Sequence, residues 1–201
     1  MGEALFTKHV MAARQVVLVF ISTVLFAAAQ AESDKTEAGR TVDIKEFLLE
    51  NQKVSVYEAT DRGNKMCVTD VYTAVTAADA VFKRYFANGT KPLYLDLKGV
   101  FGPTEQERDA RFTTMSVYMV ETSGTKFSDE TMLYFSPDGN CGVFNVTDYT
   151  GESWYDVRVK YDTVKLKHTS CFEFYKDLRR DTKSRSVYQN TCPPVNSNIK
   201  E

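Results

Sequence analysis

The sequence lacks the residue patterns on which most enzymes depend. Its 201 residues include only two histidines, and it contains no Gly-x-Ser-x-Gly, HExxH or phosphate-binding glycine loop. A nucleophile with its base, or a set of catalytic metal ligands, cannot be assembled from such a chain. We therefore expect a protein that is not an enzyme and that uses no cofactor or metal.

No apolar run in the sequence is long enough to cross a membrane. The apolar run Val16–Ala29 is about 14 residues long, which is short of the roughly 20 needed to span a bilayer. It follows Lys8 and Arg14 and ends in the small-residue pattern Ala29-Gln30-Ala31. This arrangement is typical of a secretory signal peptide, so we expect residues 1–31 to be removed and the protein to be extracellular.

Charge of one sign is not concentrated anywhere in the chain. The formal net charge is −2, and acidic and basic residues are interspersed. This pattern argues against nucleic acid and against a membrane surface as partners. Residues 32–201 suit one domain, with a flexible leader at 32–40 and a flexible tail at 193–201, and we expect a monomer.

Cysteine is scarce, but its even number is informative. The four cysteines are Cys67, Cys141, Cys171 and Cys192, and none forms a CxxC pair. In a secreted chain this number indicates two disulfides, each worth roughly 3 to 5 kcal/mol. A zinc site is disfavoured because His168 is the only histidine after the signal peptide. The residues alone leave three pairings open.

Two sequons are candidate glycosylation sites, Asn88-Gly89-Thr90 and Asn145-Val146-Thr147. Asn88-Gly89 is also a strong hairpin turn, so a sugar there would lie on an exposed loop tip.

Periodicity in the sequence predicts an all-β fold with two helices. Ile44, Phe47 and Leu48 share one face of a short amphipathic helix, and Asp43 has capping-box spacing to Glu46. A second helix is indicated where apolar residues recur at helical spacing from 171 to 178. Between them, alternating runs are separated by short turn signals, and a closing strand precedes Cys192. We expect an antiparallel barrel of about eight strands, which leaves room for one small ligand.

A family resemblance follows from the order of several short segments. VDIKEFLL, VYEAT, MCVTDV, SPDGNCGVFNV, ESWYDV, CFEFYKDL and SRSVYQNTC resemble the tick salivary lipocalins of the histamine-binding protein family over nearly all of residues 32–201. The resemblance implies an eight-stranded lipocalin-like barrel with disulfides Cys67–Cys192 and Cys141–Cys171. It also implies secretion into saliva and sequestration of host mediators, such as histamine, serotonin or leukotrienes, which suppresses inflammation and defence at the bite site.

The amine-binding members of that family carry a Cys-Asp-aliphatic step, then Glu-Leu-aromatic, then Cys. In this chain the corresponding residues are Cys141-Gly142-Val143, Glu152-Ser153-Trp154 and Cys171. Glu152 and Trp154 are retained and would supply a carboxylate and an aromatic face for an amine. Gly142 replaces the acid, and a lost charge-assisted hydrogen bond costs roughly 1.5 to 3 kcal/mol.

The resemblance places further residues in the ligand pocket. Phe127 and Asp129 are similar to an aromatic and acid step of the family, and Tyr118 falls where the family has an aromatic residue. Tyr57 is a further candidate, although Tyr57, Tyr118 and Phe127 also suit core packing. Asp96 is a candidate inward acid, but a slip of one residue would put Leu97 inside and turn Asp96 outward.

Three functions remain as alternatives. Glu152 and Trp154 favour a scavenger of biogenic amines. Gly142, together with a shortened loop whose only acid is Asp61, favours a scavenger of lipids such as leukotrienes, fatty acids or sterols. The third is a modulator of a host immune or complement protein that acts through its surface. The number of carboxylates inside the barrel should separate the first two.

Overall fold

The structure is a computed structural model that describes residues 39–49, 53–89, 91–102, 111–122 and 124–195. The expected signal peptide, most of the leader and most of the tail lie outside the described residues, as does Thr90 of the first sequon. None of the helices in the described part is long and apolar enough to cross a bilayer.

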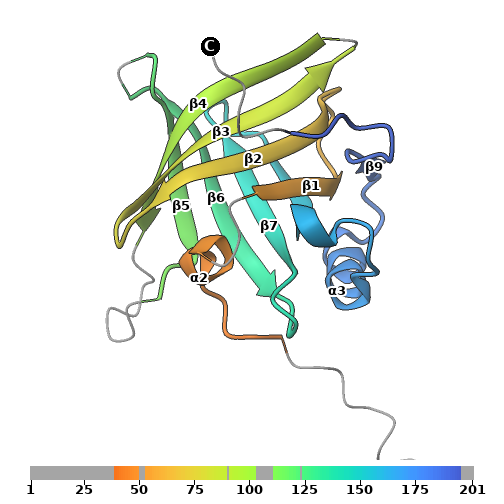
Figure 1. The fold of residues 1–201 in the computed structure, drawn as a ribbon. Coiled ribbons are helices and arrows are strands. Elements are labelled where there is room, and N and C mark those ends of the chain that lie inside the picture. Colours follow the sequence, from red (N-terminus) through yellow and green to blue (C-terminus); the bar gives the residue numbers. More distant parts are fainter. Residues whose placement is uncertain (1–38, 50–52, 90, 103–110, 123, 196–201) are drawn as a thin grey trace, which may run out of the picture. The chain divides into compact units, whose positions relative to one another are not determined.

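Eight antiparallel strands form a closed barrel (Figure 1). Neighbours in sequence pair from β2 to β8, and β1 closes the barrel by pairing with both β8 and β2. The predicted all-β barrel is therefore confirmed. The strands are β1 Lys53–Ala59, β2 Met66–Val75, β3 Asp79–Asn88, β4 Lys91–Gly102, β5 Thr114–Met119, β6 Lys126–Phe135, β7 Cys141–Asp148 and β8 Ser153–Lys160.

The first predicted helix is present as α2, Ile44–Leu49. The Asp43 carboxylate caps it, accepting hydrogen bonds from the backbone N–H groups of Lys45 (3.0 Å) and Glu46 (3.2 Å). Ile44 and Phe47 are fully buried, and the Phe47 ring lies 5.6 Å from that of Phe135 on β6. The helix thus lies at one end of the barrel (Figure 1), where its buried apolar side chains join the barrel core.

The second predicted helix, α3 (Thr169–Arg179), packs on the outside of the barrel. Its buried residues Cys171 and Tyr175 face Val143 of β7 and the outward valines of β8. A short 3-10 helix, η1 (Tyr161–Thr163), leads from β8 toward it.

The predicted closing strand is much shorter than expected. It is reduced to β9, Arg185–Ser186, which pairs with Glu58 and Ala59 of β1. The strand is short because β2 already pairs with Lys53–Ser55 along the same edge of β1. Only the last residues of β1 are left to pair with β9.

Two disulfides tie the outer segments to the barrel. Cys67 on β2 bonds to Cys192 after β9, and Cys141 on β7 bonds to Cys171 on α3. This is the pairing that the family resemblance implies.

Candidate functional site

A cavity of about 350 Å³ opens at the end of the barrel away from α2. Its position follows from β6, where Phe127 lines the cavity and Phe135, at the other end of the strand, packs on α2. The apolar lining consists of Val56, Ala59, Val68, Phe127, Val146, Trp154 and Val187. The charged lining consists of Asp61, Arg62, Lys65, Arg84, Asp148, Glu152, Asp156, Arg158 and Arg185.

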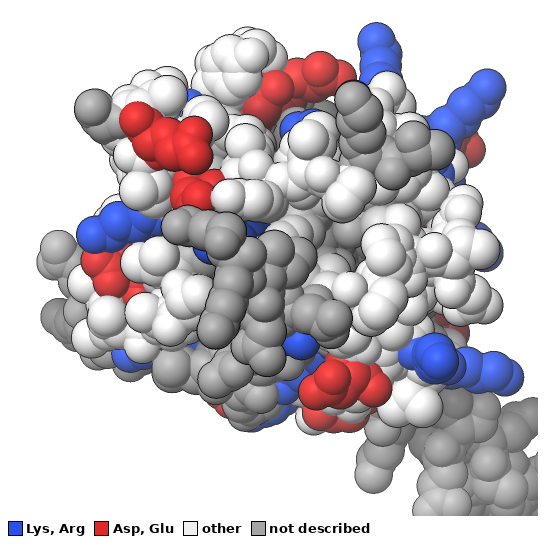
Figure 2. Space-filling view, turned by 45° about the horizontal axis from the view of Figure 1, so that its top comes forward, with Lys and Arg blue, Asp and Glu red and all other residues white. Residues whose placement is uncertain are grey.

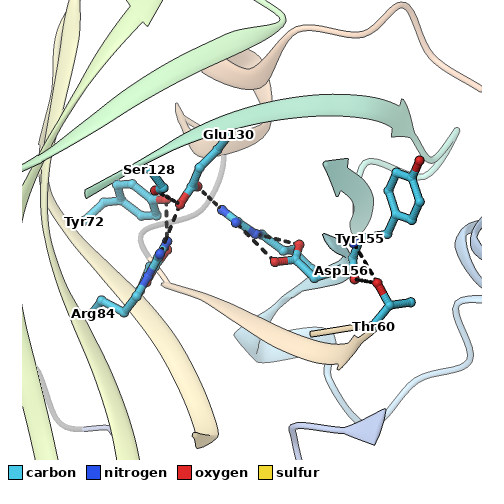
Figure 3. A network of polar contacts seen from close by, with 9 residues as sticks. Thr60, Tyr72, Arg84, Ser128, Glu130, Tyr155 and Asp156 are labelled. Carbon is cyan, nitrogen blue, oxygen red and sulfur yellow. Dashed lines mark hydrogen bonds and ion pairs between the residues drawn. The ribbon is translucent and has the colours of Figure 1, made fainter. Parts of the chain in front are cut away.

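Below the cavity, a chain of buried ion pairs crosses the barrel (Figure 3). Arg84 on β3 donates to both carboxylate oxygens of Asp70, each at 2.7 Å, and to Glu130 at 3.0 Å. Glu130 on β6 also accepts from Arg158 at 2.5 Å. Arg158 in turn donates to both oxygens of Asp156, at 3.0 and 3.3 Å. We call these five residues the charge network; its order is Asp70, Arg84, Glu130, Arg158, Asp156.

All five residues of the charge network are buried, although Arg84, Arg158 and Asp156 also form the floor of the cavity. The centre of the network is held by further contacts. Glu130 is fully buried, and it also accepts a hydrogen bond from the Ser128 hydroxyl at 3.2 Å. The Arg158 guanidinium lies 4.3 Å from the centre of the Phe144 ring, which adds a cation-π contact. Buried charges require partners of this kind, because an unpaired one would be strongly destabilising.

The network perturbs its own carboxyl groups in opposite directions. Burial would raise the pKa of Glu130, but the neighbouring guanidiniums of Arg158 and Arg84 hold it down at about 2. The pKa of Asp156 is raised, because burial, together with the nearby charge of Glu130, outweighs the attraction of Arg158 and the weaker attraction of Arg84. The two carboxylates therefore differ in how readily each would take up a proton.

The strand period explains why these charges lie inside. On β8, Trp154, Asp156 and Arg158 occupy alternate positions and share the inner face, while Val157 and Val159 pack under α3. On β1 a bulge places both Tyr57 and Glu58 opposite Val157, so that Ala59 returns to the inner face.

The rim of the cavity is braced by the C-terminal segment. Arg185 on β9 forms a bidentate pair with Asp61, at 2.6 and 2.9 Å, and also donates to the Lys65 carbonyl at 2.8 Å. The Lys65 ammonium then lies over the rings of Phe86 (4.8 Å) and Phe127 (5.8 Å). Burial and the nearby charge of Arg84 lower the pKa of Lys65.

Three of the residues predicted from the sequence line this cavity together. Trp154 and Phe127 form parts of its wall, and Glu152 lies at its exposed rim on the turn before β8. Their contact with a ligand stays a prediction, but the structure brings them to one place.

The other four predicted site residues lie elsewhere. Asp129 pairs with Lys126 and accepts a hydrogen bond from Ser116 on the outer face. Asp96 pairs with Lys83, while Leu97 is fully buried, which is the outcome of the slip considered above. Tyr118 lies opposite Lys98 on the outer face, between inward Val117 and Met119.

Tyr57, the fourth, belongs to the α3 side of the barrel. Its ring lies 5.4 Å from that of Phe172 and stacks at 5.8 Å on Tyr188. It lines a separate, shallow groove beside α3 together with Leu166 and His168.

Gly142 lies on the inner face, close to the α2 end. Its partners in the strand register are Phe135 on β6 and Arg158 on β8. A Cβ atom at this position would lie 2.6 Å from Met132 Cε and 3.1 Å from the Phe144 ring. Apolar packing therefore fills the position where the amine-binding proteins that the sequence resembles carry an acid.

The sequence prediction missed the charge network, although a signal was present. Continuing the alternation from Trp154 would have placed Asp156 and Arg158 on the same face. On β6 the inward acid is Glu130, the neighbour of the predicted Asp129.

Charged side chains around the barrel are mixed in sign. Figure 2 shows acidic and basic residues interspersed on the visible face, without an extended area of one sign. This distribution agrees with the interspersed charges of the sequence.

Comparisons with known proteins support the architecture. No protein-family model matches the sequence, and no curated protein matches it. A solved structure of a protein named AM182 in complex with serotonin is similar, with a TM-score of 0.61 and 14% identity, covering 81% of this chain and 99% of that one. The siderocalin Ex-FABP, described as having dual ligand specificities, has a TM-score of 0.53 and 8% identity, covering 75% and 99%.

The fold is lipocalin-like. A structure of Japanin from Rhipicephalus appendiculatus bound to cholesterol is also similar, at 12% identity over 69% of this chain and 92% of that one, but its TM-score of 0.46 is too low to carry an argument. At these identities the likeness shows the fold, and the ligand of this lipocalin-like barrel must be argued from its own cavity.

Proposed function

We propose that this protein is a secreted lipocalin that sequesters a small biogenic amine in the cavity of its barrel. The observation that carries the proposal is the cavity itself, which places Trp154 and Phe127 beside the carboxylates Glu152 and Asp156. Secretion is supported by the signal-peptide pattern in the sequence and by the two disulfides.

A protonated amine must replace its lost hydration when it enters a cavity. Such a group requires a carboxylate and gains further from an aromatic face when it leaves water. The cavity of about 350 Å³ offers both and lies within the usual size range of small-molecule sites. The serotonin complex of AM182 is an example of the same fold holding an aromatic amine.

A second candidate is an amphiphile with a carboxylate, such as a fatty acid or a leukotriene. It is favoured by Lys65, whose ammonium has no ion pair within the described residues and lies near Arg84 at the cavity. The apolar wall could take the start of an acyl chain. The charge network below it limits how far such a chain could enter the barrel.

Native mass spectrometry of the secreted protein is the direct test. A retained lipid would appear as a mass difference and would favour the second candidate. The emptied protein is then titrated with serotonin, histamine and oleate by calorimetry. Trp154 is the only tryptophan of the chain, so its fluorescence reports occupancy of the cavity by histamine or oleate, which do not emit in the tryptophan range.

For a scavenger we expect an amine Kd from about nanomolar to sub-micromolar. A Trp154→Phe variant provides the control, since it should lose the fluorescence signal but keep the calorimetric one. Absence of amine binding in both measurements would refute the amine proposal, and oleate binding alone would replace it with the lipid one.

A further inference from the structure

The charge network is not balanced. It holds three carboxylates, those of Asp70, Glu130 and Asp156, against the two guanidiniums of Arg84 and Arg158. With all five groups ionised, one negative charge remains inside the barrel. A buried excess charge is costly unless a further cation approaches it.

The members of the network are not equally satisfied. Glu130 bonds to both guanidiniums and to Ser128, and Asp70 holds Arg84 by two bonds and lies 3.5 Å from the Tyr72 hydroxyl. Asp156 stands at one end of the network, and among the described residues Arg158 is the only hydrogen-bonding partner of its carboxylate. The excess charge therefore has its least compensated position at Asp156.

Asp156 is also the carboxylate of the network that a ligand can reach. It lines the cavity, whereas Asp70 and Glu130 do not. It lies two positions after Trp154 on the same face of β8, so a group at Asp156 is adjacent to the indole.

The cations at the cavity do not neutralise this end. Arg185 is engaged by Asp61, Arg62 is exposed to solvent on the loop before β2, and Lys65 lies over Phe86 and Phe127, where the nearby charge that most affects it is that of Arg84. The lining is therefore positive toward Arg84 and Lys65, whereas the Asp156 end holds one guanidinium, that of Arg158, which is shared between the two carboxylates of Asp156 and Glu130. A ligand cation would find its complement at the Asp156 end.

We infer that Asp156 is the counter-ion of the bound amine, and that it docks the ammonium group at the floor of the cavity beside Trp154. This inference rests on the proposed function and names the group that would give it specificity. Glu152, the acid predicted from the sequence, is exposed on a turn, where solvent and salt screen its charge. It guides the amine toward the cavity and contributes less to holding it.

The test pairs two variants with two ligands in one cycle. Serotonin is compared with 5-hydroxytryptophol, which has the same ring and a hydroxyl in place of the ammonium. Wild type, Asp156→Asn and Glu152→Gln are titrated with both by calorimetry. Asp129→Asn, which removes an acid from the outer face, is the matched control.

We expect wild type to prefer serotonin at least about tenfold, the loss expected for one charge-assisted hydrogen bond. Asp156→Asn should bind both ligands with nearly equal affinity, while Glu152→Gln and the control should keep most of the preference. Thermal unfolding of each variant confirms folding, and Asp156→Asn should unfold no earlier than wild type because it removes the unbalanced charge.

Each other outcome overturns the inference in a recognisable way. If Asp156→Asn keeps the preference, or if Glu152→Gln abolishes it, Asp156 is not the counter-ion, although the amine function stands. If Asp156→Asn weakens both ligands equally, the residue only maintains the shape of the cavity. If wild type binds neither ligand, the proposed amine function fails together with the inference.

Discussion

The two ends of the barrel interior are built from the same strands but by different means. Near α2, β6 and β7 contribute Met132, Phe135 and Phe144, which pack on Phe47 and leave no space for a side chain at Gly142. A few residues away, β6 contributes Ser128 and Glu130 to a band of paired charges below an open cavity. One end is suited to stability, and the other retains charge where a ligand could use it.

Truncating a large side chain at the apolar end should give the largest loss of stability. Phe47 is fully buried and touches the rings of Phe135 and Phe144. We expect Phe47→Ala to lower the free energy of unfolding by about 4 kcal/mol, through lost burial and the cavity left behind. Urea denaturation measures it. Leu166→Ala, at an exposed position, is the control, and a loss of similar size there would contradict a special role for the α2 end.

A mutation in the charge network should give the next largest loss of stability. Glu130→Gln removes the carboxylate that joins the two guanidiniums, and we expect a loss of about 3 kcal/mol because two buried charge-assisted hydrogen bonds, one to each guanidinium, are lost. Asp129→Asn on the same strand removes an exposed acid paired with Lys126, and its loss should stay below about 1 kcal/mol. Equal losses in chemical denaturation would show that the inward position of Glu130 has no special weight.

Protonation of Glu130 should account for part of the loss of stability in acid. The pKa of Glu130 is about 2 in the folded protein against 4.5 for a free side chain, so it stabilises the fold above pH 4.5. That contribution, up to about 3 kcal/mol, is lost as the pH falls from 4.5 toward 2. Asp156, with its raised pKa, acts in the opposite sense and weakens the fold once ionised.

Denaturant titrations at several pH values measure this dependence. The acid slope of the unfolding free energy should be shallower in Glu130→Gln than in wild type. An unchanged slope would mean that other carboxyl groups account for the acid sensitivity.

Introducing an acid at position 142 should not strengthen amine binding. We expect Gly142→Asp to cost about 2 kcal/mol, because its Cβ would meet Met132 and its carboxylate would enter a packed interior. Serotonin affinity, measured by calorimetry, should not rise. Gly142→Ala isolates the steric part and should cost about 1 kcal/mol. A gain in affinity for Gly142→Asp would show that the α2 end can open to a ligand.

The sequence predicted the barrel well because its signals are local. Alternation and turns define the strands, and the spacing of Ile44, Phe47 and Leu48 defines α2. The short β9 was not predictable in this way, because its length depends on how much of the β1 edge is left free by β2.

The site was predicted less completely for a similar reason. Glu152, Trp154 and Phe127 were found from motifs and lie at one cavity. The inward orientation of Glu130 rather than Asp129, and of Leu97 rather than Asp96, depends on strand register, where one residue reverses the face. Which charges pair across the barrel depends on strands distant in sequence, so the charge network required the structure.

The smallest expected effect concerns the positive side of the cavity. Lys65→Met removes an ammonium that lies over two aromatic rings and near Arg84, so stability should change by less than about 0.5 kcal/mol. Because it removes a repelling charge, serotonin affinity should rise slightly, whereas oleate affinity should fall severalfold. Lys165→Met makes the same charge change at an exposed position outside the cavity lining and should alter neither affinity. If Lys65→Met weakens serotonin instead, the amine occupies the Lys65 side of the cavity, and the assignment of opposite charges to its two sides is wrong.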